Sequence, residues 1–525
     1  MNVKLKLIGA CALVGAFAVT PASAEWANTV GIGQKSSNIG TAGVATASDY
    51  DVFYANPAGA ANMTTPTIGV GVKVLNTTNL DNSETSATGG TFNHGAENTL
   101  TGSTNGYLPS VGAYVPGLLP NVVIGVGFGA PFALAASWGS GQPVSLSAPA
   151  DPTTQAGANG ANSLGFSKVE VVLAELSPTV GIKLSDKLNV GVSVGFSTLK
   201  AMALDIGVGI AAAEVNALDV NNVFGGAGPD VQTTLKARTS DDLGLPIPPW
   251  EFATGPHEAS FTIGAQYQLL PNVAIGAVYR SEAPVEYELN LALDLGPLAA
   301  GLGVPAANGG IDRSTGSIKI ETPRHVQIGA TIDVTPQLRV HTDVKWTNWS
   351  NAVGIGSNAI VSINTGGAIL GGLAQQLVLP QSGDDTYSFH LGAEYKLLPN
   401  LELQAGYNYD PAVFDTPDLS YLMYSTDRHI FSAGATLELP DSALFGTNGT
   451  WEWTVGGQWI QYEDITVQAG QSNSFGLTPG ALTLGGLPDV NFSPNQQSFD
   501  LGGYIWTAGI SGVYKFGAPE EVYLK

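Results

Sequence analysis

Residues 504–516 read YIWTAGISGVYKF, and their alternation indicates the fold class. Aromatic residues stand near both ends of one parity, at Tyr504, Trp506, Tyr514 and Phe516, with small or apolar residues between them. A strand that crosses a bilayer shows this pattern because amphipathic rings favour the two membrane–water interfaces. The stretch therefore predicts a transmembrane β-strand, placed late in the chain where a barrel closes on its first strand.

The composition favours a barrel over soluble domains or membrane-spanning helices. Of the 525 residues, 67 are glycine and only 12% are charged, with a formal net charge of −23. Soluble domains usually have a charged fraction of about 25%. Apolar residues are abundant but spread by alternation, without the ~20-residue apolar run of a spanning helix beyond the N-terminus. The negative charge disfavours nucleic acid as a partner.

Residues 1–24 have the features of a secretory signal peptide. An apolar stretch at 7–19 precedes the small-residue cleavage site Ala22-Ser23-Ala24, so we expect the mature chain to begin at Glu25. A competing interpretation takes Cys11 as a lipoprotein attachment site, but this would leave a very short apolar core. Cys11 is the only cysteine, so the predicted mature chain contains no disulfide and no thiolate metal site.

A short turn recurs between alternating segments. Its copies are LLPNV at 118–122, LLPNV at 269–273 and LLPNL at 397–401, with looser copies at 184–188 and 334–338. Proline presets the turn dihedral and asparagine bonds back to the backbone. Each copy therefore predicts a tight hairpin between strands of about ten residues.

Long segments join the opposite ends of these strands. They lie at 76–105, 133–165, 206–257, 292–313, 350–382, 413–424 and 467–498. Short turns at one end and long loops at the other are typical of outer-membrane barrels. With two strands per long loop, the chain is predicted to be all-β, an antiparallel transmembrane barrel of about 14 strands over residues 67–516. Residues 517–525 would form a C-terminal tail.

Charged residues of the strands fall on one parity. In 338–349, Arg339, His341, Asp343 and Lys345 share one face, opposite an apolar face. That charged face would be solvated surface in a soluble sandwich and lumen in a barrel. We favour the lumen because closure removes sheet edges and keeps backbone polar groups out of lipid.

Residues 25–66 do not alternate and are rich in Gly, Ala, Ser and Asn. They precede the first good strand pattern at 68–74. This segment is either an unstructured arm or a plug inside the barrel, which larger barrels need.

The order of these features resembles the long-chain fatty acid transporter family (FadL and TodX type) of Gram-negative outer membranes. Residues 33–43, followed by Asn56-Pro57-Ala58, are similar to the hatch of that family. Residues 279–282, 346–350 and 426–434 are similar to three further family segments. The matches extend over nearly the whole predicted mature chain.

The resemblance implies a barrel plugged by a hatch over residues 25–66. It also implies passive uptake of hydrophobic molecules through a lateral opening in the third strand. Nine residues follow Phe516, so the aromatic carboxyl terminus usual in the family is missing. The long loops, where substrate choice is expected, align poorly with the family.

Three basic residues are candidates for ligand binding. By resemblance, Arg428 matches a family arginine that contacts the ligand head group, and Lys200 aligns with another such basic residue. Arg428 and Arg280 have inward parity, whereas strict alternation turns Lys200 outward unless a β-bulge, or a position above the membrane, redirects it. A carboxylate in a low-dielectric pocket is costly unless paired. Each residue could instead form a structural ion pair in the lumen.

The expected third strand contains Gly127, Gly129 and Pro131. Proline cannot donate to the ladder and the glycines loosen the strand, so a kink here could open the side of the barrel. Alternatively, Pro131 ends the strand at the outer rim. By resemblance, Asn56-Pro57-Ala58 would be the part of the hatch that faces this opening.

The long loops contain apolar stretches at 206–215, 293–304 and 359–379. Exposed apolar patches tend to mark binding sites, so these stretches are candidates for substrate capture. Alternatively, they pack on one another as a cap over the barrel.

Signals for an enzyme are weak. Residues 191–195 fit Gly-x-Ser-x-Gly, but they lie in an alternating strand rather than at the strand-to-helix turn that the motif requires. The six histidines show no metal-ligand spacing. We therefore expect no catalytic residues, no metal site and no cofactor.

The sequence thus predicts a channel in the Gram-negative outer membrane for passive uptake of hydrophobic molecules, with long-chain fatty acids as the leading substrates. Its other partners would be outer-membrane lipid and lipopolysaccharide. The alternatives are an aromatic hydrocarbon channel of the same fold, a general porin, a structural or adhesive outer-membrane protein, and a secreted β-rich enzyme.

Overall fold

A computed structural model describes most of the chain. The described residues are 31–81, 84–85, 91–92, 105–137, 144–145, 163–210, 231–239, 259–294, 310–354, 357, 359–363, 376–379, 382–419, 425–440, 449–468, 471 and 498–517. The predicted signal peptide at 1–24, with Cys11, lies outside them, as does all of the predicted tail except Gly517.

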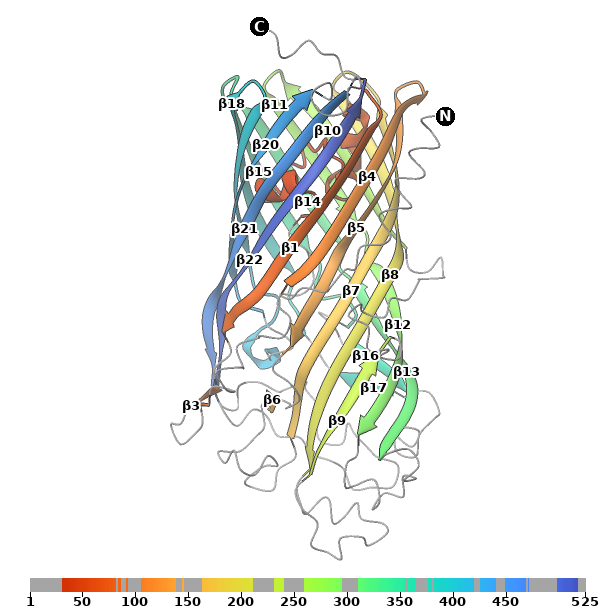
Figure 1. The fold of residues 1–525 in the computed structure, drawn as a ribbon, viewed down its shortest axis with the longest axis vertical. Helices are drawn as coiled ribbons and strands as arrows, with labels where there is room; N and C mark the ends of the chain where they lie inside the picture. Colours follow the sequence, from red (N-terminus) through yellow and green to blue (C-terminus); the bar gives the residue numbers. More distant parts are fainter. Residues whose placement is uncertain are drawn as a thin grey trace, which may run out of the picture.

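Fourteen long strands form one closed antiparallel barrel, which confirms the predicted fold class (Figure 1). Each strand pairs with the next, and the last pairs with the first to close the ring. In order they are β1 (Thr67–Asp81), β4 (Asn105–Leu119), β5 (Val122–Ser137), β7 (Ser163–Lys183), β8 (Leu188–Ile210), β10 (Ala259–Leu270), β11 (Val273–Arg280), β14 (His325–Asp333), β15 (Leu338–Thr347), β18 (Thr386–Leu398), β19 (Leu401–Asp410), β20 (Arg428–Pro440), β21 (Gly449–Val467) and β22 (Ser498–Phe516).

The predicted tight turns are all present. Two-residue Pro-Asn turns join β4 to β5, β10 to β11 and β18 to β19, and four-residue turns join β7 to β8 and β14 to β15. Asn121, in the first of these turns, has a φ of 62°, a left-handed conformation that asparagine tolerates better than most residues. These turns fix the register of the hairpins.

The two faces of the barrel wall follow the predicted parities. On β22, Trp506 and Ile510 are exposed on the outer surface, whereas Thr507 and Ser511 are buried toward the interior. On β15, Asp343 is buried on the inner face and hydrogen-bonds to the chain inside the barrel. Apolar and aromatic side chains therefore face outward, as a lipid-facing wall requires.

Several segments expected to be loops contain further strands. The hairpin of β11 and β14 continues past the barrel wall as β12 (Ala283–Asp294) and β13 (Ile311–Thr322). With β9 (Val231–Arg238), β16 (Ala359–Ile363) and β17 (Gln376–Leu379) they extend the sheet at the loop end of the barrel (Figure 1). The predicted loops 206–257, 292–313 and 350–382 are therefore only partly loops, because alternation continues into them.

The remaining elements are short. They are β2 (Glu84–Thr85), β3 (Thr91–Phe92), β6 (Val144–Ser145) and the 3-10 helix η5 (Thr416–Asp418). No helix in the described ranges is long and apolar enough to cross a membrane.

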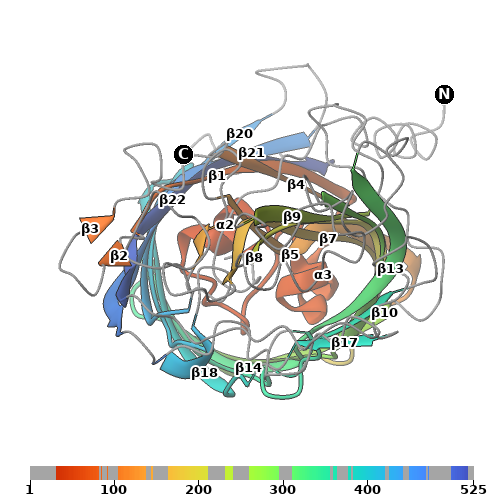
Figure 2. The same ribbon diagram turned by 90° about the horizontal axis from the view of Figure 1, so that it is seen from below.

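Residues 31–66, called the N-terminal segment below, lie inside the ring of strands (Figure 2). They form two short α-helices, α2 (Gln34–Asn38) and α3 (Val52–Ala55), and the 3-10 helix η2 (Pro57–Asn62). Of the two alternatives raised by the sequence, the structure therefore has the segment folded within the lumen.

Candidate functional site

Polar side chains of the barrel wall hold the N-terminal segment in place. The Asp343 carboxylate on β15 accepts hydrogen bonds from the backbone N–H groups of Gly43 at 2.9 Å and Val44 at 3.0 Å. On β1, Lys73 Nζ donates to the Gly31 carbonyl at 2.7 Å and to Ser37 Oγ at 2.6 Å. These contacts satisfy backbone groups that would otherwise be buried without partners.

Glycines on the inner wall let the N-terminal segment approach the strands closely. A Cβ atom added at Gly434 or at Gly456 would lie 1.9 Å from the amide side chain of Asn38. Asn38 fills this space and donates to Gln404 Oε1 at 2.9 Å and to the Val455 carbonyl at 3.1 Å. The alternating glycines of the strands thus have a packing reason that the sequence analysis did not recognise.

The Asn56-Pro57-Ala58 motif does not face the third barrel strand, contrary to the expectation from resemblance. A Cβ at Gly264 on β10 would meet Asn56 Oδ1, and one at Gly191 on β8 would meet the Pro57 backbone. Asn56 Nδ2 also donates to the Val44 carbonyl at 2.8 Å. The motif therefore packs between β8 and β10, where it caps η2 and ties two parts of the N-terminal segment together.

Two other residues of the N-terminal segment face the third barrel strand, β5. A Cβ at Gly127 would lie 1.9 Å from the Phe53 ring, and one at Gly129 would lie 2.9 Å from Ile32. These glycines are needed because the N-terminal segment presses on β5 at this level. Ile32 and Phe53, which the sequence analysis did not single out, are thus the groups behind the predicted lateral opening.

The ladder between β4 and β5 ends inside the wall. Its last pair is Val111 with Phe128, although β4 goes on pairing with β1 as far as Asn105. On its other side, β5 pairs with β7 as far as Ser137, with a register shift between Gly129 and Phe132. Figure 1 shows β5 and β7 running past the end of β4 toward the loops.

This interruption, called the β4–β5 seam below, includes Pro131. Because β5 continues to Ser137, Pro131 does not end the strand, and the register shift is a β-bulge around it. Leu108 of β4, Ala130 of β5 and Ala174 of β7 form a buried apolar cluster at the seam. Apolar side chains therefore pack across the seam where the β4–β5 ladder has ended.

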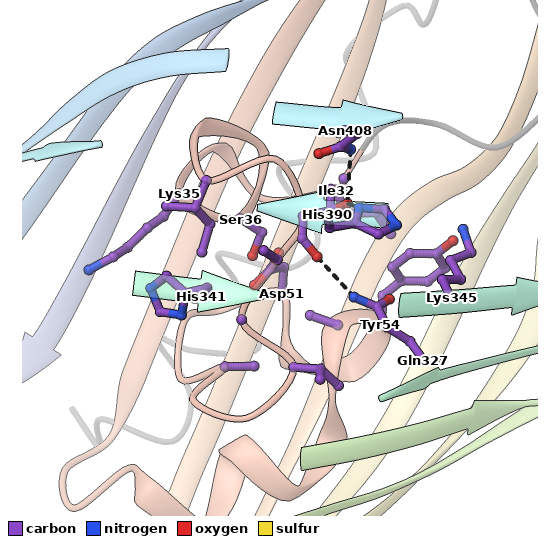
Figure 3. A pocket seen from close by; sticks show the side chains of 18 of the residues that line it. Ile32, Lys35, Ser36, Asp51, Tyr54, Gln327, His341, Lys345, His390 and Asn408 are labelled. Atoms are coloured by element: carbon purple, nitrogen blue, oxygen red, sulfur yellow. Dashed lines mark hydrogen bonds between the residues drawn. The ribbon is translucent and has the colours of Figure 1, made fainter. Parts of the chain in front are cut away.

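A cavity lies between the N-terminal segment and the inner wall formed by β14, β15, β18, β19 and β20 (Figure 3). It holds about 1090 Å³ of space not filled by atoms, part of which is open to solvent. Its lining combines apolar side chains such as Ile32 and Ile430 with charged ones, among them Lys345 and Arg428. This composition suits an amphiphile better than either a purely polar or a purely apolar molecule.

Arg428 is the one predicted ligand-binding residue that lines this cavity. It is buried, and its Nε donates to Asp410 Oδ2 at 3.0 Å while Nη2 donates to the same oxygen. The other oxygen of Asp410 accepts from Ser388 Oγ. Arg428 therefore points inward, as predicted, and already has a carboxylate partner within the protein.

Arg280 is also inward and buried, and it lies outside the lining of this cavity. Its guanidinium forms an ion pair with Glu175, donates to Thr262 Oγ1 at 3.2 Å and stacks 5.0 Å from the centre of the Tyr54 ring. The residue thus links β7, β10 and α3, and this arrangement matches the structural alternative raised by the sequence.

Lys200 is turned inward by a β-bulge at Thr198. In the pairing of β7 with β8, Ala174 is opposite Leu199 and Glu175 is opposite Ser197, so one extra residue of β8 reverses its parity. Lys200 is buried, and its Nζ donates to the Glu286 carbonyl of β12. Strict alternation was wrong at this position because a bulge leaves one residue unpaired.

The hairpin of β12 and β13 presents an apolar face that the sequence analysis assigned to loops. Val285, Tyr287, Leu289 and Leu291 of β12 are buried on one face. Glu286, on the opposite face, is exposed. This face extends an apolar surface from the barrel toward the loop end.

Charged groups of the N-terminal segment also line the cavity. Lys35 pairs with Glu402 at 2.9 Å and with Glu394 at 3.4 Å. Burial acts to lower the pKa of Lys35, but attraction by these two carboxylates outweighs it and raises the pKa. Burial raises the pKa of Asp49 and of Asp51 above the usual carboxyl range, which makes both weak counter-ions.

The Gly-x-Ser-x-Gly pattern at 191–195 lies within the regular strand β8, as predicted. Thr179 Oγ1 donates to Ser193 Oγ at 3.0 Å across the ladder. Within the described part of the chain, no cluster of three or more His, Cys, Asp or Glu side chains is arranged to hold a metal ion.

Solved structures share this architecture. A FadL homologue from Pseudomonas aeruginosa superimposes with a TM-score of 0.64 at 14% identity, covering 95% of this chain and 100% of that one. The toluene transporter TodX from P. putida gives 0.59 at 15% identity, covering 93% and 100%. The toluene transporter TbuX from Ralstonia pickettii gives 0.52 at 16% identity, covering 93% and 99%. At these identities the likeness shows the fold.

A closed barrel with a folded segment in its lumen and an interrupted seam defines an outer-membrane transport protein. The model of the family described as "Outer membrane protein transport protein (OMPP1/FadL/TodX)" matches residues 16–444, and the chain belongs to this family. Its members are outer-membrane β-barrel channels for hydrophobic small molecules. No curated protein matches the chain.

Proposed function

We propose that this chain takes up long-chain fatty acids passively, binds them in the lumen and releases them sideways through the β4–β5 seam. The family supports the transport of hydrophobic compounds, and it favours this class over a general porin or an adhesive protein. A fatty acid is the favoured substrate because the cavity offers cationic side chains beside apolar ones.

The observation that supports lateral release is the end of the β4–β5 ladder at Val111 and Phe128. Elsewhere in the wall, consecutive backbone hydrogen bonds would have to break before a ligand could pass between strands. Beyond this pair the β4–β5 ladder is missing, and Leu108 packs with Ala130 and Ala174 across the seam. Such apolar contacts can open and close without leaving backbone polar groups exposed to lipid.

The cavity and the seam share a residue. Ile32 lines the cavity and also faces Gly129 of β5, so a tail that occupies the cavity would lie next to the seam. We propose that the N-terminal segment acts as a hatch whose Ile32 and Phe53 block this exit when no ligand is bound. The apolar face of β12 would guide the tail inward from the loop end, and the carboxyl group would stay in the polar part of the cavity.

A reversible cross-link tests lateral release. The predicted mature chain contains no cysteine, so the pair Leu108→Cys and Ala130→Cys places a single disulfide across the seam. Uptake of radiolabelled oleate would be measured in a Gram-negative host that lacks its own fatty acid channel. We expect oxidation to reduce uptake at least about tenfold and a reductant to restore it, because a disulfide prevents separation of the strands.

The matched control is Ala113→Cys with Val126→Cys, which joins β4 to β5 where the ladder is intact. Oxidation of this pair should leave uptake unchanged. Equal uptake by the oxidised and reduced forms of the seam pair would show that ligand leaves by another route.

Aromatic hydrocarbons are the second candidate substrates. Two of the structures with this fold bear the name toluene transporter, and the apolar face of β12 offers such a molecule a surface that needs no charge. A hydrocarbon has no group to pair with Arg428 or Lys345, so removing either charge should spare toluene uptake while reducing oleate uptake.

A further inference from the structure

We propose that Lys345, with His390 as the second contact, forms the subsite that binds the carboxyl group of the ligand. This assignment rests on the proposed function, and it places the head group at a residue that neither the sequence analysis nor the resemblance selected. It also changes the role of Arg428. By pairing with Asp410, Arg428 keeps that carboxylate from pairing with Lys345, so that Lys345 can bind the ligand.

Lys345 belongs to a row of side chains at one level of the inner wall. Strand register sets Gln327 of β14 opposite Lys345 of β15, and Lys345 opposite Ser388 of β18. Ser388 bonds to Asp410 of β19, which is opposite Arg428 of β20. The five residues form a continuous belt across five neighbouring strands on the side of the cavity.

The charges in this belt do not balance. Asp410 has one oxygen bonded to Ser388 and the other bonded to Arg428. Lys345 contributes a second positive charge, and its Nζ has no hydrogen-bond or ion-pair partner among the described residues. One positive charge is therefore in excess at the cavity wall, where an unpaired charge is costly until an anion arrives.

Three other carboxylates near the cavity bond to groups other than Lys345. Glu394 pairs with Lys35 and lies 3.2 Å from the His341 ring. Asp343 accepts from two backbone N–H groups and from Gln327 Nε2. Asp51 accepts from the Gly33 N–H at 3.1 Å. None of them is in ion-pair contact with Lys345, so its charge is left for a ligand.

Other cations of the inner wall and the N-terminal segment contrast with Lys345. Lys35 and Arg280 each form an ion pair with a carboxylate. Arg339 pairs with Asp333 at 2.7 Å. Of these four cations in the described part of the chain, Lys345 is the one without a carboxylate in ion-pair contact.

His390 supplies the second contact because one ring nitrogen is committed and the other is not. His390 Nδ1 lies 3.0 Å from the Gly40 carbonyl, and since a carbonyl can only accept, Nδ1 must carry the hydrogen. Nε2 is buried without a partner and, in the neutral ring, is an acceptor. Nε2 can therefore take up the proton of an incoming carboxylic acid, and the resulting imidazolium N–H then donates to the carboxylate whose other oxygen accepts from Lys345.

The spacing suits one carboxyl group. Lys345 is opposite Ser388, so His390 is its diagonal neighbour on β18, and such positions lie roughly 7–8 Å apart at the backbone. A lysine side chain is long enough to reach across such a gap. Both residues line the cavity, as does Tyr54, and Figure 3 shows all three on its wall.

Equilibrium binding to the purified full chain in detergent micelles tests the assignment. The probes are radiolabelled oleate and its methyl ester, which has the same tail and no charge. We expect Lys345→Met to weaken oleate binding about 10- to 100-fold, the usual effect of losing a hydrogen bond to a charged group. Binding of the methyl ester should change less than about twofold, and Lys345→Arg should keep most of the oleate affinity.

The matched control is Lys319→Met on β13, which removes a half-exposed lysine that pairs with Glu321 at 2.8 Å. It should leave the binding of both probes unchanged. Oleate binding that survives Lys345→Met while the wild-type chain binds oleate would overturn the assignment and leave the proposed function standing. A wild-type chain that binds neither probe would overturn both. Equal loss of both probes in Lys345→Met would show a collapsed cavity and contradict the head-group role.

Discussion

Arg280 and Arg428 occupy similar places and have different surroundings. Both lie at the end of a barrel strand, both are 5% exposed, and both are bonded to a carboxylate. Arg280 pairs with Glu175, which also accepts from Ser260 Oγ at 3.4 Å, and its guanidinium lies against the Tyr54 ring, so the charges of this pair balance. Arg428 shares its belt with Lys345, so one positive charge is left over. An inward arginine therefore does not by itself mark a ligand site; the local charge balance does.

The largest expected effect lies at the pair of Arg280 with Glu175. Arg280→Met would leave Glu175 buried without its counter-ion, and breaking a buried pair in this way costs about 3–5 kcal/mol. We expect the free energy of unfolding, measured by denaturant titration in micelles, to fall by this amount. Oleate affinity should change less than about twofold. A stable variant with a large loss of oleate binding would show that Arg280 binds the ligand and would contradict the proposed difference between Arg280 and Arg428.

A smaller effect is expected in the belt that contains Lys345 and Arg428. There, Arg428→Met should weaken oleate binding about tenfold. The reason is indirect, because Asp410 loses its partner and attracts Lys345 instead. The double variant Arg428→Met with Asp410→Asn leaves Lys345 as the only charge in the belt. Its oleate affinity should return to within about threefold of the wild type. No recovery in the double variant would mean that Arg428 contacts the ligand directly.

The smallest effect is expected at Lys200. Its Nζ donates to the Glu286 carbonyl and so joins β8 to β12 outside the belt. Lys200→Met should change oleate affinity less than about twofold, because the interaction is made to protein rather than to ligand. Isothermal titration with the same detergent preparation would detect a larger change, and a tenfold loss would place a second head-group site near β12.

Much of the fold could be predicted from the sequence because the barrel strands repeat one local pattern, in which outward apolar residues alternate with inward polar or small ones. Parity in 504–516 and 338–349 gave the correct lipid and lumen faces, and the Pro-Asn turns gave the hairpin ends. Strict alternation fails at Lys200, where a bulge at Thr198, one of the two conditions raised from the sequence, reverses the parity. No pattern of residue types marks that bulge, because it is set by the pairing partner on β7.

The site was less predictable because it depends on which strands share a level. Lys345 was visible as an inward residue, but its place beside Asp410 and Arg428 follows from the register of β15, β18, β19 and β20. The placement of Asn56-Pro57-Ala58 was also wrong, since packing in the lumen decides which wall the motif meets. The signal that could have helped is the set of inward glycines, which marks where the N-terminal segment touches the strands.

A crystal structure of the full chain with bound oleate would test the central claim most directly. The account predicts the carboxyl group within hydrogen-bonding distance of Lys345 Nζ and His390 Nε2, with the Arg428–Asp410 pair unbroken. A carboxyl group seated on Arg280, or on Arg428 after displacement of Asp410, would contradict it.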